Sequence, residues 1–480
     1  MHLDGQGPLF GQVYRALRNS IVSGVLVAGA RVPASRRLAE DLGVSRTTVL
    51  AALEQLAAEG YLVGRRGSGT YVQARAAAPR PSLRRRPTTR PTMSQLGHRL
   101  SEPRHLPLQG GYVHARPALR WDFRYGLPAI REFPLEAWHR CLGRRARRSS
   151  ARAFDYGPPQ GSIDLREALA AYLGRARGIV CMPEQIVVVT GSQQGLDLVA
   201  RLVLDPGDAA IVEEPAFEGA RNAFRAAGAM VHALRADAEG LDTSQLARIP
   251  AARLVCVTPS HQFPLGGILS WSRRAELLAW AHAADAWVIE DDYDGEFRYG
   301  GRPIAPLKAL DQDDRVLYLG TFSKVMFPAL RLGYLVLPPA WVEPVTRMKL
   351  LADGGSARLE QDALADFISS GHFERHVRRA RLRGAERRAA LVEALHGRFD
   401  DRVEVVGAEA GLHVVAWMRD RPGRTTRSVV ERAAAAGVGV YAITPYYTTP
   451  PPTVGLILGY AGLTPKAIGA GITRLSEAIA

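Results

Sequence analysis

The sequence predicts a multidomain protein in which a small helical domain precedes a larger α/β domain built on a mainly parallel sheet. The chain has 480 residues, and since domains of about 100–200 residues are usual, at least two are expected. Apolar residues recur at helical spacing near the N-terminus, whereas continuous apolar runs alternate with long helical segments beyond about residue 121. The composition, 47% hydrophobic and 23% charged, excludes a disordered or collagen-like chain.

The excess positive charge divides the chain into residues 1–72, 73–120 and 121–480. The formal net charge is +15. Residues 1–72 hold eight arginines and five acidic residues, and residues 73–118 hold nine arginines and one acidic residue. This asymmetry points to nucleic acid or another polyanion as a partner of the N-terminal part. The Arg- and Pro-rich stretch 73–120 is a predicted linker, either a solvated tether or an arm that assists DNA binding.

Three helices are predicted in the first 60 residues. Apolar spacing over Leu9–Ile21 indicates the first. The second begins with Ser35 as N-cap and stops at Gly43, and the third is capped by Ser45 and runs to Glu59. Two helices joined by a tight turn that contains glycine form a helix-turn-helix, whose second helix meets base edges and phosphates.

A short hairpin follows these helices. Residues 61–63 and 70–72 read as strands around a glycine-rich tip, which makes the hairpin a wing suited to the minor groove or the DNA backbone. The alternative is a small interaction domain with a solvated basic face. The third helix and the wing would present these residues to DNA: Ser45, Arg46, Thr47, Thr48, Arg65, Arg66 and Gly67.

This head resembles the winged helix of GntR-type bacterial regulators. The resemblance covers residues 8–72 and includes Pro33-Ala34-Ser35-Arg36, Leu42-Gly43-Val44-Ser45-Arg46-Thr47-Thr48-Val49 and Gly67-Ser68-Gly69-Thr70. It implies a double-stranded operator DNA partner, contacted by Arg36, Arg46, Thr47, Thr48 and Gly67.

Polar clusters follow the apolar runs of the large domain, where ligands bind in parallel sheets. Gly191-Ser192-Gln193 opens a helix after a strand, which favours a phosphate, and Arg331 offers a bidentate partner for the same group. The chain has only four lysines, at 308, 324, 349 and 466, and Lys324 follows Ser323 at the end of a strand. A primary amine at that place can form a Schiff base with an aldehyde cofactor.

Three further side chains complete a site for pyridoxal phosphate. Asp291 can keep a pyridine nitrogen protonated, Tyr293 can bond a ring hydroxyl, and Phe217 offers an apolar face. Taken singly, each has a plainer explanation: Lys324 as a surface lysine, Asp291 as part of a solvated loop or magnesium site, Phe217 as core. Their common position at strand ends favours the cofactor, and no metal site is predicted.

The order and spacing resemble fold-type I aminotransferases, and among them the C-terminal domain of MocR-type regulators with its smaller α+β subdomain. The motifs include Tyr156-Gly157-Pro158-Pro159-Gln160-Gly161, Glu214-Pro215-Ala216-Phe217 and Phe322-Ser323-Lys324. The resemblance implies that Lys324 is the catalytic residue, joined to pyridoxal 5'-phosphate as a Schiff base. It also implies a homodimer in which Tyr156 reaches the partner subunit's phosphate. The implied cofactor contacts are Gly191, Ser192, Gln193, Ser323 and Arg331 to the phosphate, Asp291 to the ring nitrogen, Tyr293 to the ring oxygen and Phe217 to the ring face.

Two positions depart from the aminotransferase pattern. Phe263 stands where an asparagine usually bonds the ring oxygen, and Ile457 stands where an arginine usually grips the substrate carboxylate. Without that bidentate clamp an amino-acid substrate is positioned less well, so cofactor binding is expected and a physiological transamination is not. Arg221 and Arg225 are candidate substitutes for the clamp.

The sequence therefore predicts a one-component transcription regulator whose large domain senses an amine, an amino acid or pyridoxal phosphate. Two alternatives stay open: an active aminotransferase with a vestigial head, and a DNA-binding protein whose large domain only dimerises. A cytoplasmic protein with no membrane partner is expected, since no apolar run approaches the roughly 20 residues of a membrane span.

Overall fold

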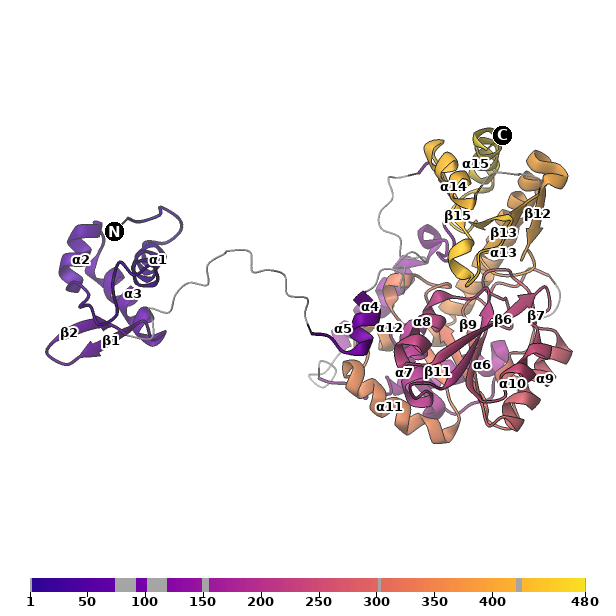
Figure 1. The fold of residues 1–480 in the computed structure, drawn as a ribbon, viewed down its shortest axis with the longest axis horizontal. Helices are drawn as coiled ribbons and strands as arrows, with labels where there is room; N and C mark the ends of the chain where they lie inside the picture. Colours follow the sequence, from indigo (N-terminus) through magenta and orange to yellow (C-terminus); the bar gives the residue numbers. More distant parts are fainter. Residues whose placement is uncertain are drawn as a thin grey trace. The chain divides into compact units, whose positions relative to one another are not determined.

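The computed structural model describes residues 2–73, 92–101, 119–148, 155–300, 304–419 and 425–479. The chain forms two compact units, Met1–Thr92 and Met93–Ala480, each of which is described by itself (Figure 1). Most of the predicted linker lies outside the described residues. In the described parts of the chain, no helix is long and apolar enough to cross a membrane.

The first unit contains three helices and a two-stranded hairpin, as predicted. These are α1 (Leu9–Val22), α2 (Ser35–Leu42), α3 (Arg46–Ala58), β1 (Leu62–Arg65) and β2 (Gly69–Val72). The helices pack around a buried apolar core that includes Val13, Leu17, Val49 and Leu56, and the antiparallel hairpin pairs Leu62 with Val72. One prediction is wrong: Ser35 is the first helical residue rather than the N-cap, because Ala34 occupies the cap position and no side chain caps the helix.

An eight-stranded sheet forms the centre of the second unit. Its order is β4 (Ile186–Val189), β11 (Gly333–Val336), β10 (Val316–Thr321), β9 (Trp287–Asp292), β8 (Ala252–Val257), β5 (Ala209–Glu214), β6 (Met230–Asp237) and β7 (Gly240–Leu241). The neighbours from β10 to β6 pair in parallel, whereas β11 and β7 pair antiparallel with theirs. The predicted mainly parallel sheet is confirmed, and the carboxyl ends of its central strands meet at one edge.

Helices cover both faces of this sheet (Figure 1). They are α5 (Leu135–Arg148), α6 (Ile163–Arg177), α7 (Ser192–Val203), α8 (Glu218–Ala227), α9 (Trp271–Ala283), α10 (Leu307–Leu310), α11 (Pro339–Asp353), α12 (Arg358–Ser369) and α13 (His372–Phe399). Alternate residues of β4 point to opposite faces: Ile186 and Val188 join the core with α6 and α12, and Val187 and Val189 join the core with α7 and α8. Burial on both faces explains why β4 is apolar throughout.

A smaller α+β subdomain follows α13, as predicted. Its antiparallel sheet has the order β12 (Val403–Val406), β13 (His413–Met418), β16 (Val454–Gly459) and β15 (Tyr441–Ala442). The helices α13, α14 (Thr426–Ala435) and α15 (Pro465–Ala478) contribute to its core. The short strand β3 (Trp121–Asp122) pairs with β14 (Val438–Gly439) and ties the start of this unit to its end.

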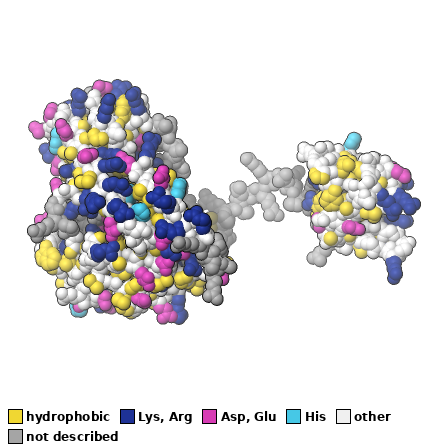
Figure 2. Space-filling model, turned by 180° about the vertical axis from the view of Figure 1, so that it is seen from behind, with side chains coloured by type: hydrophobic (Ala, Val, Ile, Leu, Met, Phe, Trp, Pro, Cys, Tyr) yellow, Lys and Arg dark blue, Asp and Glu magenta, His cyan; other side chains and the backbone are white. Residues whose placement is uncertain are grey.

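Arginines gather on the surface of the second unit although the net charge of this part of the sequence is small. Figure 2 shows Lys and Arg side chains in a band across the middle of one face. Arginines of α5 and α13 lie close to His372. Its pKa is lowered by burial and by the guanidinium groups of Arg375, Arg140, Arg144 and Arg379.

Candidate functional site

The start of α3 carries the predicted DNA-contact residues on an exposed, well-capped helix end. The Ser45 hydroxyl oxygen accepts a hydrogen bond from the Thr48 amide at 3.1 Å, and it lies 2.7 Å from the hydroxyls of both Thr47 and Thr48. Arg46 is exposed and donates from Nε to the Ser35 hydroxyl at 3.3 Å, which brings the starts of α2 and α3 together. The exposed Arg36 follows Ser35 directly.

The hairpin tip holds the remaining predicted contacts. The Arg65 guanidinium lies 4.8 Å from the centre of the Tyr71 ring, and Arg66 is exposed beside it. Gly67 has a φ of 77°, so the turn uses the left-handed region that glycine adopts freely. Within the described residues, Arg36, Arg46 and Arg66 form no ion pair, so their charges are available to a polyanion; the DNA-contact roles stay predictions.

A cavity of about 310 Å³ opens at the carboxyl ends of the central strands in the second unit. Eight of the predicted cofactor residues line it: Ser192, Gln193, Phe217, Asp291, Tyr293, Ser323, Lys324 and Arg331. The fold therefore brings these side chains into one site from five segments at the ends of strands.

Lys324 reaches into the cavity from the turn after β10. Its side-chain nitrogen donates to the Gly126 carbonyl oxygen at 2.9 Å. Burial lowers the pKa of Lys324, against the opposing effect of the Asp294 and Asp291 carboxylates. A lowered pKa favours the neutral amine, the form that attacks an aldehyde carbon.

Asp291 provides the test of whether these residues fit the cofactor. It stands at the end of β9, is 5% exposed, and its Oδ1 has no hydrogen-bond partner among the described residues. Burial and the neighbouring Asp292 raise the pKa of Asp291 to about 7. An unpartnered buried carboxylate is costly, and a protonated pyridine nitrogen would satisfy it. The residues present therefore fit pyridoxal phosphate.

One end of the cavity is formed by the start of α7 and by Arg331. Gly191 precedes Ser192 with a φ of 91°, and a side chain there would meet the Arg331 guanidinium at 3.2 Å. Arg331 donates to the Thr190 carbonyl oxygen at 2.5 Å. Amides at a helix start, a guanidinium and a hydroxyl are groups that bind anions, so this end of the cavity suits a phosphate; the phosphate-binding roles stay predictions.

Aromatic side chains form the other wall. The Phe217 ring lies 6.2 Å from Phe263, which lies 5.8 Å from Tyr293, and both pairs meet edge to face. The Tyr293 hydroxyl lies 2.9 Å from Nδ1 of His261. Tyr156 is 96% exposed and does not line the cavity of its own chain, so its contact with a partner subunit stays a prediction.

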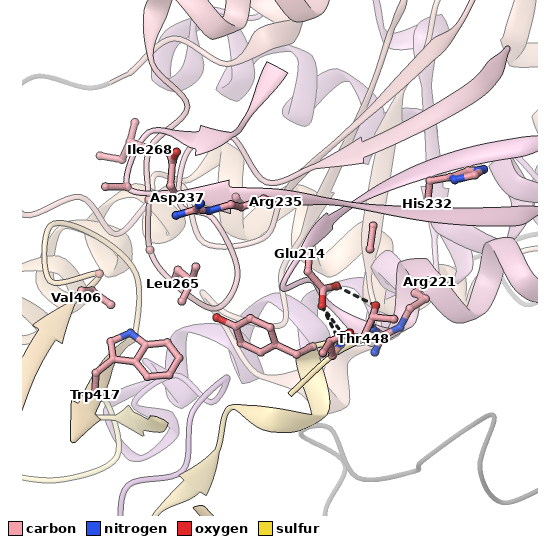
Figure 3. A pocket seen from close by; sticks show the side chains of 18 of the residues that line it. Glu214, Arg221, His232, Arg235, Asp237, Leu265, Ile268, Val406, Trp417 and Thr448 are labelled. Carbon is pink, nitrogen blue, oxygen red and sulfur yellow. Dashed lines mark hydrogen bonds between the residues drawn. The ribbon is translucent and has the colours of Figure 1, made fainter. Parts of the chain in front are cut away.

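The position of the missing carboxylate clamp is apolar. Ile457 of β16 is fully buried in a cluster with Tyr125 and Tyr446, whose hydroxyls are hydrogen-bonded to each other. Neither candidate substitute lines the Lys324 cavity: Arg221 and Arg225 line a separate, larger cleft. Arg221 donates there to the Pro445 carbonyl oxygen at 3.1 Å. Figure 3 shows its side chain among those that line this cleft.

Two protein families match different parts of the chain. Residues 9–72 match the gntR family of bacterial regulatory proteins, and residues 131–475 match the class I and II aminotransferases. The chain is 39% identical, over 99% of its length, to the probable rhizopine catabolism regulatory protein MocR of Rhizobium meliloti, of which it covers 94%. It belongs to the MocR-type subfamily of gntR regulators.

Other relatives of this MocR-type protein agree. It is 31% identical over 98% of its length to the pyridoxine biosynthesis transcriptional regulator PdxR of Corynebacterium glutamicum, of which it covers 95%. The kynurenine aminotransferase of Pyrococcus horikoshii, solved with PMP, superimposes with a TM-score of 0.68 at 31% identity, over 74% of this chain and 89% of that one. The α-aminoadipate aminotransferase LysN of Thermus thermophilus has a TM-score of 0.72 at 28% identity, over 81% and 97%. Pyridoxal phosphate is the cofactor of this fold, and the cavity fits it.

Two histidines of the MocR-type site were not predicted from the sequence as site residues. His413 lines the cavity from β13 and donates from Nε2 to the Pro264 carbonyl oxygen at 2.9 Å. Burial, with His261 and Lys324 nearby, lowers the pKa of His413 to about 3, which keeps its imidazole neutral. His261 lies two positions before Phe263, the residue that departs from the aminotransferase pattern. This closeness in the sequence is what could have pointed to His261 as a site residue.

Proposed function

We propose that this protein is a one-component transcription regulator. Its head binds operator DNA, and its second unit binds pyridoxal phosphate through Lys324. The observation that carries the proposal is the pairing, in one chain, of an exposed Arg-Thr-Thr helix start with a cavity that holds a buried amine and an orphaned carboxylate. The regulator names of the relatives over nearly the full length support it.

The proposed roles in the cavity follow from its chemistry. Pyridoxal phosphate, when bound, supplies an aldehyde that joins amines and a ring that accepts electrons. Lys324 offers the amine, Asp291 holds the proton on the ring nitrogen, and Tyr293 faces the ring oxygen. Gly191, Ser192, Gln193, Ser323 and Arg331 hold the phosphate, Phe217 covers the ring, and Tyr156 serves the partner subunit of a homodimer.

Control of DNA binding requires an effector that favours one DNA-binding arrangement over another. An amine or amino acid can compete with Lys324 for the aldehyde, and pyridoxal phosphate itself can load the cavity. Two heads in a homodimer would recognise paired half-sites. The protein would act in the cytoplasm, where bacterial DNA lies.

A spectrum of the purified protein followed by titration tests this function. We expect visible absorbance after pyridoxal phosphate is added, a borohydride-trapped adduct at Lys324, and a change of DNA affinity on loading. A colourless protein that still binds DNA would instead support a large domain that only dimerises.

An active aminotransferase is the second candidate. The chain is 30% identical, over 74% of its length, to aromatic-amino-acid aminotransferase 1 of Thermococcus litoralis, and eight of the predicted cofactor residues line one cavity. The buried Ile457 argues against it, because an apolar side chain cannot grip a carboxylate. Sustained turnover with common amino donors, together with no DNA binding at low salt, would favour this candidate.

A further inference from the structure

Behind the cofactor cavity, three side chains from two loops form a buried hydrogen-bonded group. Nδ1 of His261 lies 2.9 Å from the Tyr293 hydroxyl and 3.0 Å from Oδ2 of Asp294. His261 is 1% exposed and Asp294 is 2% exposed, so water does not compete for these bonds. Tyr293 and Asp294 both line the cofactor cavity, and His261 and Asp294 line a second cavity of about 430 Å³.

This arrangement determines where the Tyr293 hydroxyl lies. A carboxylate only accepts, so Asp294 keeps a proton on Nδ1 of His261. The same N–H then points to the Tyr293 oxygen as well, which makes that oxygen an acceptor. The tyrosine's own proton is available to the Asp294 carboxylate, to which the phenol is also hydrogen-bonded, as well as to a partner in the cavity. Burial and the Asp294 and Asp291 carboxylates raise the pKa of Tyr293 well above its usual value, so the phenol keeps that proton.

The backbone fits closely around the pair. Gly411 has a φ of 78°, and a side chain at this position would collide with both the His261 ring and the Asp294 carboxylate. The His413 ring packs against His261 with centroids 5.3 Å apart. Several titratable and charged groups surround the His261–Asp294–Tyr293 group. His413, neutral because of its lowered pKa, packs against it, and Asp291 and Lys324 lie across the cofactor cavity. The others are Glu213, Glu296, Tyr299 and Tyr460, and the arginines that share a second cavity with His261 and Asp294: Arg177, Arg298, Arg378 and Arg381.

Phe263 leaves the ring oxygen of the cofactor without the hydrogen bond that an asparagine would provide, so the His261–Asp294–Tyr293 group matters more. Its ring meets Tyr293 at an interplanar angle of 89° and has no hydrogen-bonding atom to offer the ring oxygen of the cofactor. Where aminotransferases use an asparagine and a tyrosine, Tyr293 alone remains in this chain.

We propose that His261 and Asp294 are positioning residues that hold the Tyr293 hydroxyl for a hydrogen bond to the ring oxygen of the cofactor, in place of the asparagine absent at Phe263. The inference rests on the proposed binding of pyridoxal phosphate. Partners of this kind, one step removed from the bound group, fix tautomers and orient the residues that contact it.

The test measures the pH at which the visible absorbance of the Lys324-linked cofactor changes, in a double-mutant cycle. A donor to the ring oxygen stabilises its anionic form and competes with the proton on the linked nitrogen, so losing the donor raises this midpoint. We expect Tyr293→Phe and His261→Leu each to raise it by about one pH unit. In the Tyr293→Phe background, His261→Leu should add almost nothing, because His261 acts through the hydroxyl.

Asp294→Asn is a second variant that tests the same proposal. The isosteric amide should preserve the fold, and without the carboxylate Nδ1 of His261 can accept the tyrosine proton. It should raise the midpoint in the wild-type background more than in the Tyr293→Phe background. His232→Leu, on β6 and lining the other cleft, is the matched control and should leave the midpoint unchanged.

An unchanged midpoint in both His261→Leu and Asp294→Asn would overturn the proposal, as would equal shifts with and without the Tyr293 hydroxyl. A wild-type protein that shows no visible band after addition of pyridoxal phosphate would overturn the proposed cofactor function itself. A normal visible band, with shifts of the midpoint that simply add in the double variant, would overturn only the positioning role of His261 and Asp294.

Discussion

Replacing Asp291 by asparagine tests whether its buried carboxylate is kept for the cofactor. The pKa of Asp291 rises from 3.8 to about 7 in the folded chain. The folded state therefore keeps a proton that the unfolded chain has lost, and stability falls as the pH rises from about 4 to about 7. Three pKa units correspond to about 4 kcal/mol at full ionisation, because each unit is worth about 1.4 kcal/mol.

Asparagine cannot ionise, so the cofactor-free variant should gain stability relative to the wild type as the pH increases. The difference in free energy of unfolding should grow by about 3 kcal/mol between pH 5 and pH 8. Affinity for pyridoxal phosphate should change in the opposite sense, with a loss of about 10–100-fold, because a charge-assisted hydrogen bond contributes roughly 1.5–3 kcal/mol.

Denaturant unfolding followed by tryptophan fluorescence measures the first effect. All seven tryptophans lie in the second unit, so the signal reports the unit that contains Asp291. The exposed Asp401→Asn is the control and should shift neither quantity. A stability difference that does not vary with pH, or an unchanged cofactor affinity, would refute the reasoning.

Three further predictions concern the two sites. Lys324→Ala should abolish the visible absorbance and the borohydride-trapped adduct without unfolding the protein, since among the described residues the amine donates only to the Gly126 carbonyl oxygen; absorbance that persists in the variant would place the linkage elsewhere. Arg46→Ala should weaken DNA binding and reduce the slope of log affinity against log salt by about 1, as measured by fluorescence anisotropy, and indifference to this change would move the DNA surface. Ile457→Ala should lower the free energy of unfolding of the second unit by about 2–4 kcal/mol, because it leaves a hole among Tyr125 and Tyr446, and a loss below about 0.5 kcal/mol would show that the cluster is loosely packed.

Much of the cofactor site was predictable because strand ends are local features. The apolar runs that became β4, β9 and β10 are each followed by the residues that line the cavity, so position along the sequence was enough to place Ser192, Asp291 and Lys324. The head was predictable for a similar reason, since its capping residue and turn glycine act within a few residues.

Other features depend on tertiary packing. His413 bonds to Pro264 across 149 residues, and no local pattern links β13 to that loop. Which way Arg221 and Arg225 point depends on how α8 rotates against its neighbours, and this places them in another cleft. Tyr156 is exposed in its own chain, so its role depends on a second subunit. The first helical residue of α2 was misassigned because Ala34 takes the extended cap conformation that a serine usually adopts.

The most direct test of the central claim is the affinity of the protein for a genomic DNA fragment that it selects, measured with and without pyridoxal phosphate. In the wild type, loading the cavity should change the affinity by at least about 5-fold, a coupling of roughly 1 kcal/mol. In Lys324→Ala, the affinity should no longer respond. Equal affinities for the loaded and unloaded wild type, with the visible band present, would contradict the account.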